Sequence, residues 1–239
     1  YIALAVTRGV GAIGPIQEAI PDWLAIGFGF LTQLGDGWFL LLLLAVLYWN
    51  RLRLQVDLLV LVGTYVAGIG LYRYSKAVFA LPRPHEPLLD PELVPWLFRL
   101  VYELTASASG YGFPSGHATS STIVYFGLAA VLTIGTTRQR YAVAGGLAAL
   151  VSFTRVALGV HFLVDVVAGV ALGAAVLIVT FRGIRPLARD SVTAVFLLAV
   201  GTSALYLAES DASTEAIVVC GLALGLVGGW QLVVLARHV

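Results

Sequence analysis

The chain has 239 residues, of which 59% are hydrophobic and only 11% are charged, and its formal net charge is +1. Soluble domains carry about 25% charged residues, so this composition excludes an ordinary soluble protein, and the small net charge gives no bulk attraction to nucleic acid. Apolar runs long enough to cross ~30 Å of hydrocarbon recur without the alternation of a transmembrane barrel. The sequence therefore predicts an all-α fold, a polytopic transmembrane helix bundle.

Six or seven spans are expected, at residues 30–49, 56–75, 118–135, 141–158, 162–181, 191–208 and 216–236. Asp36 weakens the first of these runs, and the charged and proline-containing segment up to Leu34 forms either surface helices or a further span. We expect one integral membrane domain over residues 1–239. Its motif-bearing core lies at about 56–181, and residues 191–236 add C-terminal helices.

Basic residues gather in three connections, which follow the first, third and fifth spans and so lie on one side of the membrane. They are Arg51 with Arg53, Arg138 with Arg140, and Arg182 with Arg185 and Arg189. The positive-inside rule makes this side cytoplasmic. The motifs described below lie at the opposite, outward-facing side, and the cell membrane is the expected location.

The long connection before the third span contains an amphipathic segment, "DPELVPWLFRLVYEL". Asp90 is a suitable N-cap, and Pro91 suits the first helical position. Apolar residues then recur at helical spacing, namely Leu93, Leu97, Leu100, Val101 and Leu104. We expect a helix lying in the outer membrane interface, which either braces the loop or forms a lid or lipid entry.

Ionisable residues are costly at membrane depth and mark functional sites by default. Here they gather at the outer ends of the spans, as Lys76, Arg83, His117, Arg155, His161 and Asp165. His161 and Asp165 are four residues apart and share one helix face, so the carboxylate can fix the imidazole tautomer of a nucleophile. A buried pair that only satisfies itself is the alternative.

Lys76, Arg83 and Arg155 offer donors that match phosphate oxygens. Interfacial snorkelling of long basic side chains is the alternative, and it accounts for Arg73 and Arg99. In "GYGFPSGH", Ser115 can begin a helix whose N-terminus favours an anion, and Gly116 allows close backbone approach. His117 is then placed to protonate a leaving oxygen.

Three segments together resemble the signature motifs of the type-2 phosphatidic acid phosphatase superfamily. They are "KAVFALPRP", "PSGH" and "TRVALGVHFLVD", which match in order and internal spacing over residues 76–165. The resemblance implies a membrane lipid phosphate phosphatase of the same helical fold. It departs from the family at Thr154, where the motif usually has serine, and His85 and Glu86 match no family residue.

The resemblance also implies roles for these residues. Lys76, Arg83, Ser115, Gly116 and Arg155 would hold the phosphate. His161 would attack phosphorus to form a phosphohistidine, Asp165 would stabilise its imidazolium, and His117 would protonate the leaving group and then activate water. The resemblance implies no metal or other cofactor, and the partners are the bilayer and a lipid phosphate or pyrophosphate.

Other functions remain open from the sequence. A lipid phosphotransferase or a haloperoxidase could use the same residues, although the peroxidase relatives are largely soluble. An anion or lipid transporter would place its charges near the bilayer midplane, whereas these lie at span ends. Gly169 and Gly173 predict close internal helix packing, and the oligomeric state and the identity of the lipid stay open.

Overall fold

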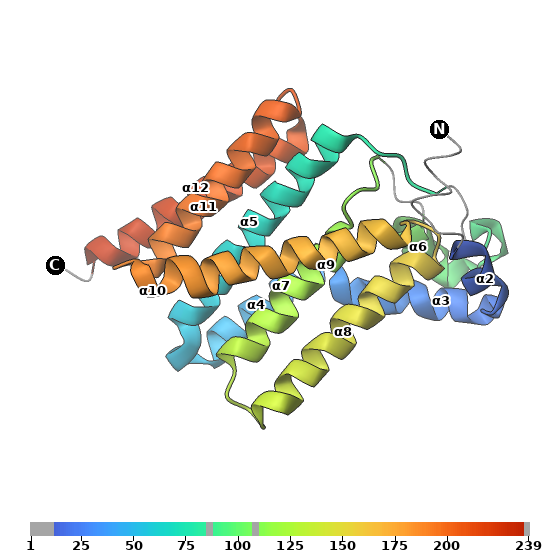
Figure 1. Ribbon diagram of the computed structural model, residues 1–239, viewed down its shortest axis with the longest axis horizontal. Helices are drawn as coiled ribbons and strands as arrows, with labels where there is room; N and C mark the ends of the chain where they lie inside the picture. Colours follow the sequence, from blue (N-terminus) through green and yellow to red (C-terminus); the bar gives the residue numbers. More distant parts are fainter. Residues whose placement is uncertain (1–11, 85–87, 107–109, 237–239) are drawn as a thin grey trace.

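The computed structural model describes residues 12–84, 88–106 and 110–236, and this part of the chain folds into helices without strands (Figure 1). His85 and Glu86 lie outside it. The helices are α2 (Ile13–Glu18), α3 (Asp22–Leu31), α4 (Gly37–Asn50), α5 (Gln55–Phe79), α6 (Trp96–Ala106), α7 (Gly116–Val131), α8 (Thr137–Ala157), α9 (Leu163–Ile178), α10 (Arg185–Leu187), α11 (Ser191–Glu209) and α12 (Thr214–Ala236). Figure 1 shows α5 between the α11–α12 pair and α7.

Four helical segments are long and apolar enough to cross a membrane: Leu52–Phe79, Leu163–Leu187, Ser191–Glu209 and Thr214–Ala236. A fifth candidate is a bent pair, Trp23–Gly35 with Gly37–Asn50. The prediction of an all-helical membrane protein is thus confirmed, and the count of six or seven spans stays a prediction. The helices α7 and α8, which cover two of the expected spans, are not among these candidates. The helix α7 has only 16 residues, and the arginines of α8, namely Arg138, Arg140 and Arg155, lower its hydropathy.

The first expected span is broken at Asp36. A 3₁₀ turn, Thr32–Gly35, follows α3, and the two parts of the pair meet at an angle of 50°. The Asp36 carboxylate accepts a hydrogen bond from the Trp38 N–H and caps α4. The residue that weakens the apolar run is therefore the residue that starts a new helix.

Glycines allow the central helices to approach closely. A Cβ added at Gly169 of α9 would lie 2.5 Å from the Ser115 carbonyl oxygen, and one at Gly173 would lie 2.7 Å from that of Thr119. At Gly127 of α7 it would lie 2.2 Å from a methyl group of Leu61 on α5. A side chain at Gly169 or Gly173 would have to displace backbone, whereas one at Gly127 would have to displace the Leu61 side chain. The predicted packing role of Gly169 and Gly173 is confirmed.

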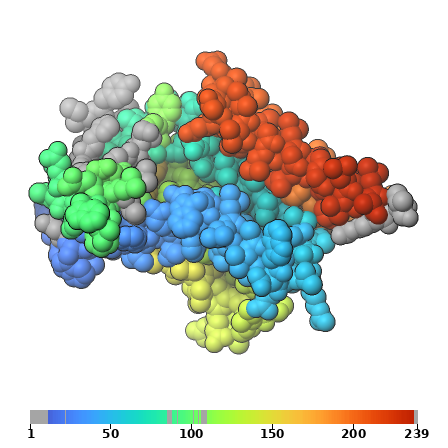
Figure 2. Space-filling model, turned by 180° about the vertical axis from the view of Figure 1, so that it is seen from behind, coloured from blue at the N-terminus to red at the C-terminus, as the bar shows by residue number. Residues whose placement is uncertain are grey.

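The C-terminal hairpin attaches to the far side of α5. Phe196 of α11 packs against Gly63, and α12 lies on the outside of the molecule (Figure 2). Arg73 of α5 forms an ion pair with Glu215 at the start of α12. The snorkelling interpretation of Arg73 stays a prediction, to which the structure adds a carboxylate partner from the hairpin.

The amphipathic segment folds differently from the prediction. Its first turn, Pro91–Leu93, is a separate 3₁₀ turn in which the Asp90 side chain accepts from the Glu92 N–H. The α-helix α6 starts only after Pro95, whose ring cannot continue the first turn. Trp96, Leu97 and Leu100 are exposed, whereas Tyr102 is buried against α3. The helix thus braces α3 and presents an apolar face outward.

Candidate active site

The structure brings the residues of the three predicted motifs to one end of the bundle. They are Lys76 near the end of α5, Arg83 in the loop after it, Ser115 to His117 at the start of α7, Arg155 near the end of α8, and His161 with Asp165 at the start of α9. Gly112 lies between the first and third motifs. A Cβ there would lie 3.1 Å from Asp165 Oδ2 and 3.3 Å from Arg83 Cγ.

His161 and Asp165 face each other at the start of α9. The Nδ1 atom of His161 lies 3.5 Å from Asp165 Oδ2, and both side chains are buried, with 2% and 0% of their surface exposed. His161 precedes the helix, because Phe162 is the N-cap, so the expectation of two residues on one helix is wrong in detail. Asp165 Oδ2 also accepts from the Phe162 N–H at 3.0 Å, which fixes the carboxylate at the helix start.

Arg83 contacts the other ring nitrogen of His161. Its Nη1 atom lies 2.9 Å from His161 Nε2 and donates to the Val160 carbonyl oxygen at 2.9 Å. A guanidinium can only donate, so Nε2 must accept with its lone pair, and the ring proton of a neutral His161 sits on Nδ1 beside Asp165. This is the tautomer that a nucleophilic Nε2 requires.

The remaining two cations reach the site from α5 and α8. Lys76 Nζ donates to the Tyr111 carbonyl oxygen at 2.7 Å, next to the glycine that separates the motifs. Arg155 is buried, and its Nη1 atom donates to Thr32 Oγ1 at 2.9 Å. Its Nε atom has no hydrogen-bond partner within the described residues. A buried donor without a partner suits an anionic ligand.

Ser115 and Gly116 form the start of α7. Ser115 is fully buried, its N–H donates to the Asp165 carbonyl oxygen at 2.8 Å, and its Oγ accepts from the Ala118 N–H at 3.4 Å. A Cβ at Gly116 would lie 2.9 Å from the Tyr72 ring. Gly116 is therefore needed for close packing against Tyr72. This reason is separate from the predicted approach of a ligand to its backbone. The Ser115 N–H therefore links the start of α7 directly to Asp165.

His117 lies across the site from α9. Its Nε2 atom is 3.7 Å from Asp36 Oδ2 and has no hydrogen-bond partner among the described residues. The side chain of His117 is 23% exposed, and that of Asp36 is 37% exposed. Unlike His161 and Asp165, these two residues come from distant parts of the sequence, and both side chains are partly exposed.

The electrostatic field at the site is strongly positive. Burial, followed by the charges of Arg83, Lys76 and Arg155, holds the pKa of the His161 imidazole well below its usual value. Burial lowers the pKa of the Arg83 guanidinium to about 10, against the opposing effect of Asp165 and with a further lowering by Arg73. A neutral imidazole surrounded by cations is the arrangement that a nucleophile toward a phosphate requires.

The sequence did not single out three residues that the structure places here: Asp36, Thr32 and Gly112. Only the fold brings residues 32 and 36 to α7 and α8, so no local pattern could reveal them. Thr154, the departure from the third motif, donates from its hydroxyl to the Val151 carbonyl oxygen at 2.7 Å, within its own helix. Within the described residues no group of three or more His, Cys, Asp and Glu side chains could hold a metal ion.

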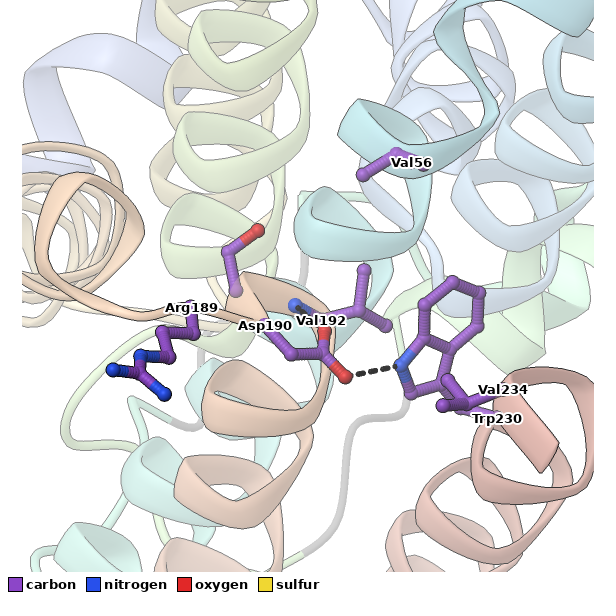
Figure 3. A pocket seen from close by; sticks show the side chains of 7 residues that line it. Val56, Arg189, Asp190, Val192, Trp230 and Val234 are labelled. Carbon is purple, nitrogen blue, oxygen red and sulfur yellow. Dashed lines mark hydrogen bonds between the residues drawn. The ribbon is translucent and has the colours of Figure 1, made fainter. Parts of the chain in front are cut away.

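A separate pocket lies at the opposite end of α5 (Figure 3). Asp190 in this pocket accepts a hydrogen bond from Trp230 Nε1 at 2.8 Å, with Arg189 and Val56 in the same lining. Val56 and Lys76 lie 20 residues apart on one helix, which corresponds to about 30 Å. The pocket therefore belongs to the other end of the bundle and contains none of the motif residues.

Comparisons with known proteins agree with the three motifs. The phosphatidylglycerophosphatase B of Bacillus subtilis (strain 168) is 29% identical over 191 residues, which cover 72% of this chain and 85% of that protein. Lipid phosphate phosphatase delta of Arabidopsis thaliana is 29% identical over 193 residues, 74% of this chain but only 42% of that longer protein.

Two solved structures share the fold. The transmembrane PAP2-type phosphatidylglycerolphosphate phosphatase from Bacillus subtilis superposes with a TM-score of 0.62 at 24% identity, covering 78% of this chain and 89% of that chain. Aquifex aeolicus LpxE gives a TM-score of 0.52 at 24% identity, covering 73% and 94%. The sequence model of the PAP2 superfamily matches residues 57–189. The chain belongs to the PAP2 superfamily, which confirms the family and the phosphatase class predicted from its motifs.

Proposed function

We propose that the protein hydrolyses a phosphomonoester or pyrophosphate of a membrane lipid through a phosphohistidine formed on His161. The observation that carries the proposal is the arrangement around this residue. Its Nε2 lone pair faces the guanidinium of Arg83, and its Nδ1 faces Asp165. A phosphate that binds Arg83 is thereby brought next to the lone pair that attacks it.

In the first step, the phosphate takes the Arg83 donors that now contact His161, and Nε2 is released to attack phosphorus. The new N–P bond forms as the P–O bond to the leaving group breaks. His117 gives a proton to the departing oxygen, and the Nδ1 proton of His161 stays beside Asp165, which stabilises the positive ring.

In the second step, a water molecule attacks the phosphohistidine. His117, now neutral, takes a proton from the water as the N–P bond breaks, and inorganic phosphate leaves with His161 restored. The histidine that donates its proton in the first step thus takes a proton back from the attacking water in the second, so this water must be able to reach it. The partial exposure of His117 supports this role.

Lys76, Arg83 and Arg155 are proposed to hold the phosphate oxygens, with the Ser115 hydroxyl and the N-terminus of α7 at Gly116. Cationic groups beside the equatorial oxygens stabilise the negative charge that these oxygens carry, and such electrostatic stabilisation is a main source of catalysis in phosphoryl transfer. These three cations supply the charge that magnesium supplies in many other enzymes. We therefore propose a metal-independent reaction.

The membrane arrangement is part of the proposal. We infer that α7 and α8 also cross the bilayer, giving six or seven spans in one domain over residues 1–239, with the site facing outward at the cell membrane. The positive-inside rule supports this orientation, because the arginine-rich connections lie at the ends of the helices opposite the site. The exposed Trp96, Leu97 and Leu100 of α6 support a position in the outer interface.

The substrate class follows from the site and its setting. A cationic site at the end of apolar helices binds a phosphorylated headgroup while the acyl or prenyl chains remain in the bilayer. The relatives named above are a phosphatidylglycerophosphatase and a lipid phosphate phosphatase, which supports the same class. A phosphotransferase would use the same first step with an alcohol in place of water.

The test is phosphate release by the purified protein from a panel of lipid phosphates and pyrophosphates in detergent micelles, with excess chelator. We expect release that persists in chelator and falls by ~10⁴-fold or more in His161→Ala, because the nucleophile is lost. Thermal unfolding of the variant in the same detergent controls for folding. No release from any lipid by a folded wild type contradicts the proposal, and phosphate transfer to added alcohol favours the transferase.

A further inference from the structure

Asp36 occupies a built position at the accessible side of the site. Its Oδ1 accepts from the Trp38 N–H at 3.4 Å, and its carbonyl oxygen accepts from the Leu40 N–H at 3.0 Å. These contacts make Asp36 the cap of α4. They leave Oδ2 directed to His117, with 3.7 Å between Oδ2 and Nε2.

The backbone around Asp36 is fitted to the helix that carries His117. A Cβ at Gly35 would lie 3.2 Å from His117 Cδ2 and 2.4 Å from a methyl group of Val151. The Leu34 carbonyl oxygen accepts from the Tyr125 hydroxyl at 2.6 Å, two turns along α7 from His117. The bend between the two halves of the first apolar segment is thus anchored to α7, and it holds the carboxylate against the imidazole.

The charges that face His117 come from every neighbouring element. Lys76 of α5, Arg83 of the following loop and Arg155 of α8 are positive, and His161 precedes α9. These cations disfavour the imidazolium form that a proton donor requires. Within the described residues, Asp36 is the one carboxylate within ion-pair distance of His117, and a negative charge at this place favours the imidazolium form.

We propose that Asp36 is a positioning residue for His117, so that the proton donor of the reaction has its own carboxylate partner, as the nucleophile has Asp165. This inference rests on the proposed phosphatase mechanism. One ring nitrogen of His117 faces Asp36, and the other gives its proton to the leaving oxygen as the P–O bond breaks. Asp36 itself transfers no proton, and the proton returns to His117 from the attacking water.

Asp36→Asn separates this role from helix capping. Asparagine is as good an N-cap as aspartate, so α4 keeps its start while the negative charge is removed. We expect kcat for an alkyl lipid phosphate to fall ~10- to 100-fold, since an orienting partner of a catalytic group contributes on this scale. The basic limb of the pH profile should move to lower pH, because His117 loses its proton more readily.

The leaving group gives the decisive readout. A nitrophenyl phosphate needs no proton donor for its departure, so Asp36→Asn should change its phosphoenzyme formation by less than about 3-fold. If Asp36 had a merely structural role, Asp36→Asn would lower the rates with both substrates by the same factor. In the double variant Asp36→Asn with His117→Ala, the first change should add nothing further. Asp57→Asn, which removes a carboxylate from the Arg185 ion pair at the far end of α5, is the matched charge control.

The two proposals fail in different ways. If the wild type releases no phosphate, the proposed function is overturned. If the wild type is active and His117→Ala shows the leaving-group dependence but Asp36→Asn matches the wild type, the role of Asp36 is overturned and the phosphatase stands. An equal loss on both leaving groups also overturns it, and Asp36→Ser repeats the test with a second capping residue.

Discussion

The two histidines of the site lie in contrasting regions. His161 and its carboxylate are four residues apart at the start of one helix, and 2% and 0% of their side-chain surfaces are exposed. His117 and Asp36 come from α7 and from the bend before α4, and their exposed fractions are 23% and 37%. The difference fits the two jobs in the proposed reaction. A nucleophile benefits from burial and a fixed tautomer, whereas a histidine that activates the attacking water must be reached by that water.

The largest effect is expected from a substitution in the buried part of the site that keeps the positive charge. Arg155→Lys retains the cation but loses the forked donors, one of which contacts Thr32 Oγ1. We expect kcat for a lipid phosphate to fall ~10²- to 10³-fold, the usual cost of removing one transition-state donor. Phosphate release measures the effect on kcat, and thermal unfolding in detergent measures the effect on stability. A variant with wild-type kcat would place Arg155 outside the phosphate site.

The pH dependence of activity tests the environment of His161. In the proposed reaction His161 must be neutral to attack, and its pKa is held well below the usual value by burial and by Arg83, Lys76 and Arg155. Activity should therefore persist as the pH falls through the ordinary histidine range. Removing one cation in Arg83→Gln raises this pKa, so the acid limb of kcat/KM should move to higher pH. The same substrate in both enzymes controls for its own ionisation, and an unmoved or lowered limb contradicts the arrangement.

The close packing of α9 against the start of α7 can be tested at Gly169. A Cβ there would lie 2.5 Å from the Ser115 carbonyl oxygen, whereas one at Gly225 of α12 would meet no atom within 4 Å. Gly169→Ala should lower stability by about 1–3 kcal/mol through overpacking and reduce activity, because the Ser115 N–H contacts the Asp165 carbonyl. Gly225→Ala is the matched control. Equal unfolding temperatures for the two variants would show that α9 can shift without cost.

The smallest effect is expected at the C-terminal hairpin. Arg73 and Glu215 join α5 to α12 through side chains that are 37% and 62% exposed. Exposed ion pairs contribute little, so Glu215→Gln should change stability by less than about 1 kcal/mol. Activity should remain within about 2-fold of the wild type, because this pair lies outside the proposed phosphate contacts. A 10-fold loss of kcat would bring the hairpin into the site and would weaken the contrast drawn above.

The sequence predicted the parts of the site that are encoded locally. The motif residues lie at helix ends, and the spacing of His161 and Asp165 is short, so their convergence followed from the helical pattern. Asp36 was interpreted only as a weakness in an apolar run, because nothing near residue 36 points to His117. The same limit applies to Arg73, whose partner Glu215 is supplied by a distant helix. Tertiary contacts between distant segments leave no periodic signal in one sequence.

Helix boundaries show the same division. The expected spans at 191–208 and 216–236 match α11 and α12 closely, since Asp190 caps α11 with its side chain and both runs are uniformly apolar. The amphipathic segment was assigned one helix from Pro91, but Pro95 divides it. His161 was placed on a helix that in fact starts at Leu163. At the start of a helix, the residue that caps the free N–H groups determines the boundary, and the apolar periodicity does not reveal it.

The central claim is the covalent intermediate on His161, and the most direct measurement is to trap it. The His117→Ala variant is mixed with a radiolabelled phosphate ester that has a nitrophenyl leaving group, quenched in alkali and analysed by peptide mass spectrometry. Without a base to activate water, the phosphoenzyme should accumulate on His161, and it should be absent when His161→Ala is added. Product release without any labelled protein, or label on another residue, would contradict the account.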